Sequence, residues 1–312
     1  MGNCIPGSPD IAANRTSSLL TDLFNFTSSS SDDDYYYYAP NDTDYAIDDA
    51  SYAAAQPCHN HYCPFFHRVA PPLLTATAAT AVAATTALLL ALALRPHAWP
   101  RGRALAAQLA LCCALFAITL FPMAVGIAWG WRAGEGPCRA MLLLWHGSVL
   151  AQGLLWGCGE RGHARRVPAV LWVVGMAMAV PAALSGGTVG TGQSAQCVQR
   201  SVDAASAAYG LHVAACCCVL LLLLPGAMLR GGWGAAGRGP GWMFWALWAP
   251  YGAALLGGFL LEVGVLPPKC GAFEGFDFAL GLGAALGGLH CCLVPLALLL
   301  AAFRGHKGGD AP

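Results

Sequence analysis

Seven long apolar runs constrain this chain more than any other feature of its sequence. Each run is close to the roughly 20 residues that an α-helix needs to cross the hydrocarbon core of a bilayer. The runs are Val69 to Leu94, Ala104 to Ala128, Ala140 to Cys158, Val167 to Leu184, Tyr209 to Leu229, Trp242 to Val265 and Phe278 to Phe303. The sequence therefore predicts an all-α membrane protein, a bundle of seven transmembrane helices.

The composition divides the chain into unequal parts. Residues 1–63 contain nine Asp and one Arg and have no helical period, a pattern that is typical of a disordered tail. We expect an acidic N-terminal tail over residues 1–66, a transmembrane domain over residues 67–303 and a short cytoplasmic tail over residues 304–312.

Two independent features predict that the N-terminal tail lies outside the cell. It contains three glycosylation sequons, at Asn14, Asn25 and Asn41, and none follows later in the chain. Most Lys and Arg residues lie in the connections that begin at Arg95, Glu160, Arg230 and Arg304. Cytoplasmic loops carry an excess of basic residues, so both features predict a multi-pass protein of the plasma membrane with an extracellular N-terminus.

Cysteines outside the spans predict disulfides. The six on the expected outer side are Cys4, Cys58, Cys63, Cys138, Cys197 and Cys270. Six cysteines allow 15 pairings, so the sequence alone leaves the connectivity open. The spacing around His59 and His61 fits no common zinc pattern, and an oxidising compartment favours disulfides. We therefore expect no metal site.

Ionisable residues are scarce within the apolar runs, where a transporter usually needs them. The candidates are His146, His212 and His290, which we expect to form hydrogen bonds between helices, with Glu262 and Asp277 near the outer ends. No phosphate loop and no pairing of a nucleophile with a base occurs. The sequence predicts no enzyme activity, no cofactor and no nucleic-acid partner, and argues against a channel or transporter.

Glycines recur in the last run, at Gly281, Gly283, Gly287 and Gly288. Small residues allow helix backbones to approach closely in lipid, so we expect them to serve helix packing.

Cys138 at the outer end of the third run and Cys197 in the following outer loop resemble the rhodopsin-like receptor family. The sixth run contains Trp248-Ala249-Pro250, which is similar to that family's Trp-x-Pro kink. The resemblance implies a disulfide between Cys138 and Cys197. A cysteine before the first run, together with Cys270 in the last outer loop, resembles chemokine receptors and implies a second disulfide. The match of Pro57-Cys58-His59 favours Cys58 over Cys63 as the partner of Cys270.

More specific fragments resemble the atypical chemokine receptors of the Duffy type over nearly the full chain. They are Met1-Gly2-Asn3-Cys4, Pro57-Cys58-His59, Pro64-Phe65-Phe66, Arg95-Pro96, Gly147-Ser148 with Ala151-Gln152 and Gly157-Cys158, and Leu289-His290-Cys291 with Pro295-Leu296. The resemblance implies a receptor that binds several chemokines, small and largely basic proteins, as a scavenger, buffer or transcytosis receptor. It also implies cycling through early and recycling endosomes, and homo-oligomers or hetero-oligomers with other chemokine receptors.

The inner face departs from signalling members of the rhodopsin-like family. Their acidic-Arg-aromatic triplet resembles Glu160-Arg161, but this pair lies two residues early, about 200° around the helix, and Gly162 replaces the aromatic residue. Cys113 occupies the place of a buried Asp, and Pro295 lacks the family's flanking Asn and Tyr. The resemblance implies little or no G-protein signalling. A conventional G-protein-coupled chemokine or peptide receptor that uses Glu160-Arg161 is the alternative.

The tail alternates carboxylates with tyrosines, a composition that attracts basic proteins. The candidate ligand-binding residues are Asp32, Asp33, Asp34, Tyr35, Tyr36, Tyr37, Tyr38, Asp44, Tyr45, Asp48, Asp49 and Tyr52. Tyrosines beside acidic residues are also candidates for sulfation. The alternative interpretation is a solvated tail that only aids solubility. On the opposite side, residues 95–103, 160–168, 230–241 and 304–312 contain no Ser, Thr or Tyr, so we expect no phosphate-dependent recruitment of arrestin there.

Overall fold

The computed structural model describes residues 62–95, 103–158, 167–190, 195–199, 206–223, 241–266 and 270–307. Side chains are described throughout these ranges except at 158, 167, 206, 262, 270–273 and 301–307. The predicted ligand-binding tail and most of the predicted cytoplasmic connections lie outside the described residues.

The described chain is almost entirely helical. Its elements are α3 (Tyr62–Leu94), α4 (Arg103–Trp129), α5 (Glu135–Cys158), α6 (Val167–Ser185), β1 (Gly187–Val189), β2 (Gln196–Val198), α7 (Ser206–Cys216), the π-helix η4 (Cys217–Leu223), α10 (Gly241–Glu262) and α11 (Cys270–Lys307). Within these ranges six helices are long and apolar enough to cross a membrane, and a shorter apolar helix, Ala207–Leu223, occupies the predicted fifth run. The predicted all-α membrane bundle is confirmed.

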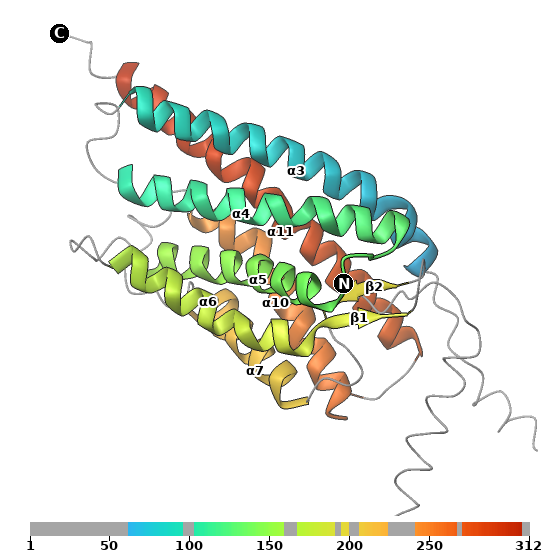
Figure 1. Ribbon diagram of the computed structural model, residues 1–312. Coiled ribbons are helices and arrows are strands. Elements are labelled where there is room, and N and C mark those ends of the chain that lie inside the picture. Colours follow the sequence, from blue (N-terminus) through green and yellow to red (C-terminus); the bar gives the residue numbers. More distant parts are fainter. Residues whose placement is uncertain are drawn as a thin grey trace, which may run out of the picture. The chain divides into compact units, whose positions relative to one another are not determined.

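Neighbouring helices close into a ring. Along the chain α3 packs on α4, α4 on α5, α5 on α6 and α6 on α7; α10 then packs on η4 and α11, and α11 returns to α3. Figure 1 shows α3, α4, α5 and α6 running roughly side by side, with the β1–β2 hairpin near the end where α3 begins. The two strands pair antiparallel, with Thr188 opposite Cys197.

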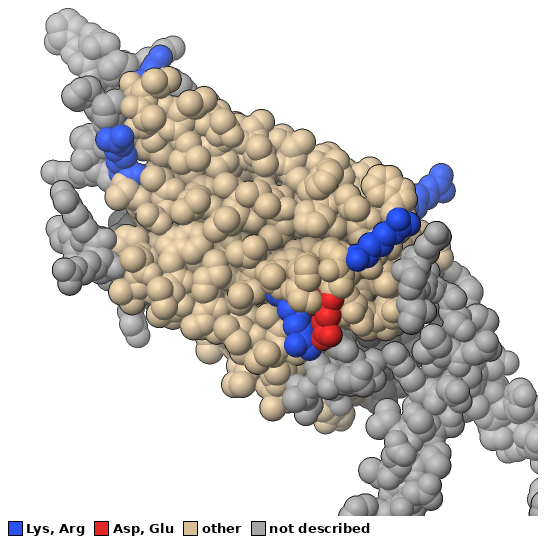
Figure 2. All heavy atoms as spheres, viewed as in Figure 1, with Lys and Arg blue, Asp and Glu red and all other residues tan. Residues whose placement is uncertain are grey.

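The outer surface of the bundle has the character of a lipid-facing belt. Many large apolar side chains are exposed on it, among them Ile118, Phe121, Val173, Leu282 and Leu300. On the face drawn in Figure 2, the Lys, Arg, Asp and Glu side chains lie towards the two ends and leave the middle uncharged. Because apolar surface of this extent is unfavourable in water, a bilayer is the solvent that such a surface requires.

Aromatic rings form the centre of the core. Trp248 of α10 is fully buried and contacts Phe116 of α4 edge-on, with ring centroids 5.7 Å apart. Trp145 of α5 lies 5.7 Å from Trp248 and 5.4 Å from Tyr251. Edge-to-face pairs of this kind add to the stability that their burial supplies, so this cluster holds α4, α5 and α10 together.

The first and last helices are longer than their apolar runs. Helix α3 begins at Tyr62 instead of Val69, inside the segment predicted as a tail, and α11 extends beyond the run at both ends. Tyr62 is buried, and its ring contacts Phe66 and Phe278, with centroids 5.5 and 4.9 Å away. Pro64 is compatible with this start because the first turn of a helix does not need its N–H. These contacts fasten the start of α3 to α11.

Glycines allow α11 to approach its neighbours, as predicted. A Cβ atom on Gly283 would lie 2.8 Å from both Cα and N of Tyr251, and a Cβ atom on Gly287 would lie 2.7 Å from the Trp248 ring. Gly281 packs in the same way against the Tyr62 side chain. Gly288 is looser, since its nearest neighbour would be 3.7 Å away. At Gly283 the contact of α11 with α10 is therefore a contact between backbones.

Candidate functional site

The outer end of the bundle is fixed by a disulfide between Cys138 and Cys197. Cys138 lies in the first turn of α5 and Cys197 in the centre of β2, and their Cα atoms are 5.6 Å apart. The bond fastens the β1–β2 hairpin to the start of α5. Two glycines before α5 help to place Cys138. Gly130 and Gly134 adopt φ values of 81° and 85°, which other residues rarely adopt. They allow the chain to reverse between α4 and α5.

Trp131 joins the same region to β2 in a second way. Its backbone N–H donates to the carbonyl of Ala195 at 2.6 Å, and its indole N–H donates to the carbonyl of Gly134 at 2.7 Å. Its ring packs on Gly126, where a Cβ atom would lie only 2.8 Å away. Trp131 therefore links the turn between α4 and α5 to the hairpin.

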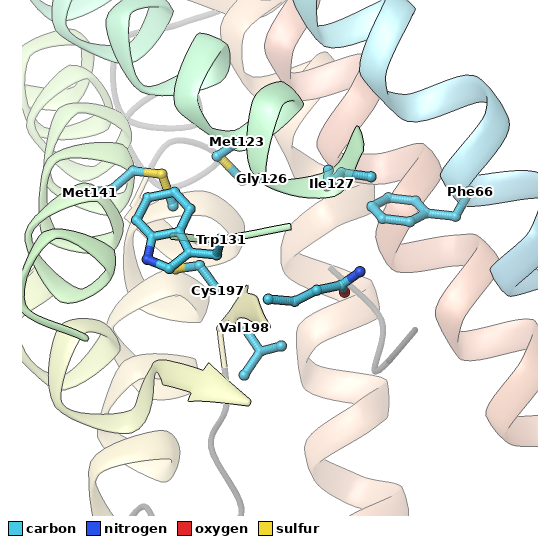
Figure 3. Close-up of a pocket in the computed structure, with 9 residues that line it drawn as sticks. Phe66, Met123, Gly126, Ile127, Trp131, Met141, Cys197 and Val198 are labelled. Atoms are coloured by element: carbon cyan, nitrogen blue, oxygen red, sulfur yellow. The ribbon is translucent and has the colours of Figure 1, made fainter. Parts of the chain in front are cut away.

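A small cavity lies beneath this hairpin. It is lined by Phe66 of α3, by Met123, Gly126 and Ile127 of α4, and by Trp131, Met141, Gln196, Cys197 and Val198. Figure 3 shows these side chains converging from three sides, with the Trp131 ring beside Met141. Its volume of about 20 Å³ is close to what one water molecule needs. The cavity is too small to bind a ligand larger than a water molecule.

A larger cavity of about 420 Å³ lies between α3 and α11. Leu120 and Trp145 line it, together with Tyr62, Phe65, Phe66, Val69, Ala70, Leu73, Leu74, Phe278, Ala279, Gly281, Leu282, Ala284 and Ala285. Its volume is typical of small-ligand pockets, but such pockets also contain a few convergent polar groups. This lining is almost wholly apolar, so the cavity is suited to an apolar group and not to a charged peptide.

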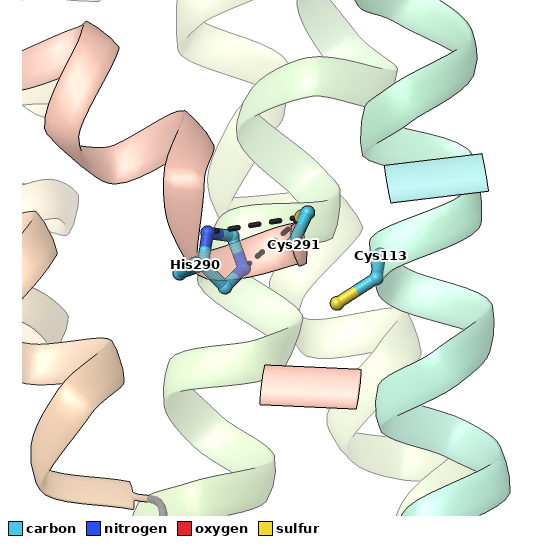
Figure 4. A group of neighbouring side chains, drawn as sticks. All are labelled: Cys113, His290 and Cys291. Carbon is cyan, nitrogen blue, oxygen red and sulfur yellow. Dashed lines mark hydrogen bonds between the residues drawn. The ribbon is translucent and has the colours of Figure 1, made fainter. Parts of the chain in front are cut away.

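A buried polar network crosses the centre of the bundle. The indole N–H of Trp248 donates to Nδ1 of His290 at 2.8 Å, and Nε2 of the same ring contacts Oε1 of Gln152. The amide of Gln152 in turn donates to Sγ of Cys113 at 3.4 Å. Figure 4 shows His290 beside Cys291, with Cys113 facing them from α4. Both nitrogens of His290 therefore have partners.

A second network lies nearer the hairpin. The side chain of Gln199, which follows β2, contacts Nε2 of His212 at 3.0 Å and the hydroxyl of Tyr251 at 3.1 Å. His290 bonds side chains of two other helices, which confirms the interhelical role predicted for it. His212 instead bonds Gln199, which lies outside the helices, and Nε2 of His146 has no hydrogen-bond partner among the described residues, so the prediction is wrong for that atom. No Asp, Glu, Lys or Arg side chain is buried among the residues that the structure describes. The two networks are built from amide, imidazole, indole, phenol and thiol groups.

The predicted site residues fall into two groups. The tail residues Asp32 to Tyr52, the sequons at Asn14, Asn25 and Asn41, and Cys58 lie outside the described residues. Cys63 is disulfide-bonded, and Cys270 is described only as the first residue of α11, so the pairing of Cys270 with Cys58 stays a prediction. The segment Glu160 to Arg166 at the inner end of the third span also lies outside the described ranges.

Sequence reasoning missed the amide side chains. Gln152 and Gln199 are buried and connect the two networks to their histidines. The signal in the sequence was a glutamine among apolar residues, because a buried amide needs hydrogen-bond partners. Only the partners could not be identified from the sequence.

Comparison with known proteins agrees with this architecture. No family model matches the sequence. Atypical chemokine receptor 1 of Macaca mulatta is 30% identical over an alignment of 326 positions, gaps included. The alignment covers 96% of this chain and 91% of the relative. The same receptor of Saimiri boliviensis boliviensis is 31% identical and that of Homo sapiens 30% identical, each with the same coverage of both chains. C-X-C chemokine receptor type 3 of Rattus norvegicus is 41% identical over 64 residues, 20% of this chain. The chain is a multi-pass membrane protein that belongs to the atypical chemokine receptor 1 family.

Proposed function

We propose that this chain is a chemokine receptor that binds several chemokines without driving G-protein activation. The relatives that match this chain over nearly their whole length are named atypical chemokine receptor 1. A shorter match is to a C-X-C chemokine receptor. The chain thus acts as a scavenger, buffer or transcytosis receptor and catalyses no reaction.

The acidic tail supplies the first contact with the ligand. It alternates carboxylates and tyrosines from Asp32 to Tyr52, and a basic partner is attracted to such a tail over distances of about 8 Å at physiological salt. Electrostatic attraction of this kind raises the rate of encounter more than it raises affinity. Sulfation of the tyrosines would add charge to the same surface.

The rigid outer face supplies the second contact. The disulfide between Cys138 and Cys197 and the bonds of Trp131 hold the hairpin in place. We propose that a second disulfide, between Cys58 and Cys270, fastens the tail to the last outer loop. Preorganised loops lose little conformational entropy when a ligand binds. A disulfide-tethered face is therefore compatible with several related chemokines.

The absence of signalling is inferred chiefly from Cys113. This residue is buried and receives a hydrogen bond from Gln152, at the place where signalling receptors of the rhodopsin-like family have a buried Asp. A cysteine provides no carboxylate for such a switch to use, and this one is already bonded by an amide. The displaced Glu160-Arg161 pair and the missing partners of Pro295 support the same proposal.

The location and fate of the receptor follow from the same proposal. We place the N-terminus outside the plasma membrane, with glycans at Asn14, Asn25 and Asn41, and we expect cycling through early and recycling endosomes. The inner stretches lack Ser, Thr and Tyr, so internalisation must proceed without phosphate-dependent arrestin. Association with a second copy or with another chemokine receptor is compatible with the lipid-facing helices.

The test measures binding and signalling in the same cells. Labelled chemokines of several classes are titrated onto cells that express the full chain, and nucleotide exchange on G proteins is measured in parallel. Saturable binding of several chemokines with exchange no higher than in cells without the receptor supports the proposal. Ligand-stimulated exchange would favour the conventional receptor, and the matched pair Arg161→Ala and Arg165→Ala would then show whether Glu160-Arg161 drives it.

Binding at the tail is tested by two variants that remove acidic residues from opposite ends of the chain. Replacing Asp32, Asp33 and Asp34 by Asn removes charge from the tail, whereas Asp310→Asn removes charge from the opposite end of the chain. We expect only the first variant to bind chemokines more slowly. Equal association rates would contradict the tail as the first contact.

A further inference from the structure

Three soft side chains meet where α5 packs near α7. His146 of α5, His212 of α7 and Cys216 of α7 are all buried, and one potential ligand atom of each lies within 4.8 Å of the others. The two imidazole rings face each other edge-on, with centroids 4.3 Å apart. This group belongs to neither the disulfide-bonded outer face nor the network around His290.

His146 is the observation that needs an explanation. Its Nε2 atom is buried and has no hydrogen-bond partner among the described residues. A buried polar atom without a partner is costly, because it has lost water and gained nothing in return. The other two span histidines, His212 and His290, both have partners. The nitrogen of His146 is therefore available to a ligand that the structure does not contain.

His212 and Cys216 have the spacing of metal ligands. His212 and Cys216 are four residues apart on one helix, which places both side chains on the same face. Sγ of Cys216 lies 3.8 Å from Nδ1 of His212. A tetrahedral or trigonal ion with bonds of about 2.3 Å to sulfur and about 2.0 Å to nitrogen would hold these atoms roughly 3.5 Å apart. Only a small adjustment separates the two arrangements.

We propose that His146, His212 and Cys216 bind a copper ion as Cu(I). Two imidazoles and one thiolate form a donor set that copper prefers, since thiolates select soft ions and imidazole suits copper. Binding breaks the S–H bond of Cys216, forms a sulfur–copper bond and releases one proton to solvent. The resulting group of Cu⁺ and thiolate is electrically neutral.

The neutrality favours Cu(I) over Zn²⁺ at this position. A divalent ion with a single thiolate would leave one positive charge inside the bundle. The described interior contains no buried Asp or Glu to compensate for it, and an uncompensated charge in apolar surroundings is expensive. A monovalent soft ion satisfies the three donors without that cost.

Gln199 and Tyr251 supply the support that a metal-binding histidine needs. A ligating histidine usually donates its other ring N–H to an acceptor, which fixes the orientation of the ring. With copper on Nδ1 of His212, the Nε2–H group would face the Gln199 amide, which lies 3.0 Å away. The amide can present its oxygen after a rotation of half a turn, because its oxygen and nitrogen occupy equivalent positions. Tyr251 contacts the same amide at 3.1 Å.

A second group of soft donors, Cys113, His290 and Cys291, lies deeper in the bundle and is shown in Figure 4. It differs in one respect, because both nitrogens of its histidine are already bonded. The tail adds His59 and His61 between Cys58 and Cys63. These two groups are the places where copper would bind if the proposal were wrong, and they supply the control variants.

The experiment uses the full chain with its disulfides intact, purified in detergent micelles and freed of metal under anaerobic conditions. Cu(I) is titrated anaerobically against a coloured Cu(I) chelator, and bound copper is counted after gel filtration. We expect one copper ion per chain, with affinity reduced at least tenfold in His146→Ala and in Cys216→Ser. The matched controls Cys217→Ser, Cys291→Ser and the double variant His59→Ala with His61→Ala should bind as the unmodified chain does.

X-ray absorption at the copper edge provides a second measurement that needs no variant. We expect one sulfur and two nitrogen neighbours in the unmodified chain. Two sulfur neighbours, unchanged binding in Cys216→Ser, or loss of binding in the tail double variant would each overturn the proposal. So would tighter binding of Zn²⁺ than of Cu(I), or no retained copper in a chain whose circular dichroism shows it to be folded.

Discussion

The close approach of α11 to α10 can be tested by adding one methyl group. In Gly283→Ala the new Cβ atom would lie 2.8 Å from Cα and N of Tyr251 and 3.1 Å from the carbonyl carbon of Pro250. All three are backbone atoms, so no side-chain rotation can relieve the overlap. The two helices would have to move apart.

The size of the effect follows from these distances. Carbon atoms pack best at about 3.5 to 4.0 Å, so the helices must separate locally by about 0.7 Å. A gap of that size loses roughly a quarter to a half of the dispersion energy of the contacts beside it. Overpacking of this kind costs about 1–3 kcal/mol, and the better helix propensity of Ala returns up to about 1 kcal/mol. We expect Gly283→Ala to lower the free energy of unfolding by about 1–2 kcal/mol.

Gly257 of α10 provides a matched control. A Cβ atom there would meet no atom within 4 Å, so Gly257→Ala should keep only the gain in propensity, up to about 1 kcal/mol. Thermal unfolding of both variants in the same detergent, followed by tryptophan fluorescence, measures their order of stability. If Gly283→Ala unfolded at the same temperature as Gly257→Ala, or at a higher one, the inferred backbone contact would be refuted.

Three further predictions follow from contacts described above. Gln152→Leu leaves Nε2 of His290 without its amide partner and should cost about 1–3 kcal/mol in thermal unfolding. Adding His290→Leu should recover part of that loss, and no recovery would contradict the network. Cys138→Ser opens a disulfide that spans 59 residues of sequence, which should destabilise the fold by about 4 kcal/mol. A reductant, which opens this bond and any other disulfide, should lower the midpoint of the unmodified chain at least as far. Glu135→Gln removes the 2.5 Å ion pair with Arg139, in which both side chains are about half exposed. This variant should change the free energy of unfolding by less than about 1 kcal/mol. A larger loss would mean that solvent does not screen this pair.

Most of the membrane architecture could be predicted from the sequence, because the bilayer requires long apolar helices whatever their neighbours are. The fourth run, predicted to end at Leu184, ends at Ser185 in the structure. The first and last helices were predicted too short because hydropathy marks only the part in lipid. Tyr62 extends α3 beyond that part through ring contacts with a helix more than two hundred residues later.

The fifth span shows another limit of prediction from an apolar run. Such a run predicts a helix but not its pitch, and here α7 continues as the π-helix η4 from Cys217 to Leu223. A π-helix bonds residue i to i+5 and turns its side chains by a smaller angle per residue than an α-helix does. The face that each residue presents after Cys216 could not be read from the period of the sequence.

The candidate sites were predictable in part. Cys138 and Cys197 were paired through a family resemblance, and the structure joins them. The group formed by His146, His212 and Cys216 was not predicted, because the spacing within α7 gives only two of its three members. His146 lies 66 residues before His212 in the sequence and joins the group only because its helix packs near α7. No local sequence pattern encodes this packing.

The uncharged interior determines how the helices of this receptor respond to the membrane potential. A membrane potential of 100 mV does about 2.3 kcal/mol of work on each elementary charge carried across the bilayer. Since no acidic or basic side chain is buried among the described residues, a rearrangement of these helices would move no side-chain charge through the field. Depolarisation of the cell should therefore leave the balance between conformations of this helical core unchanged.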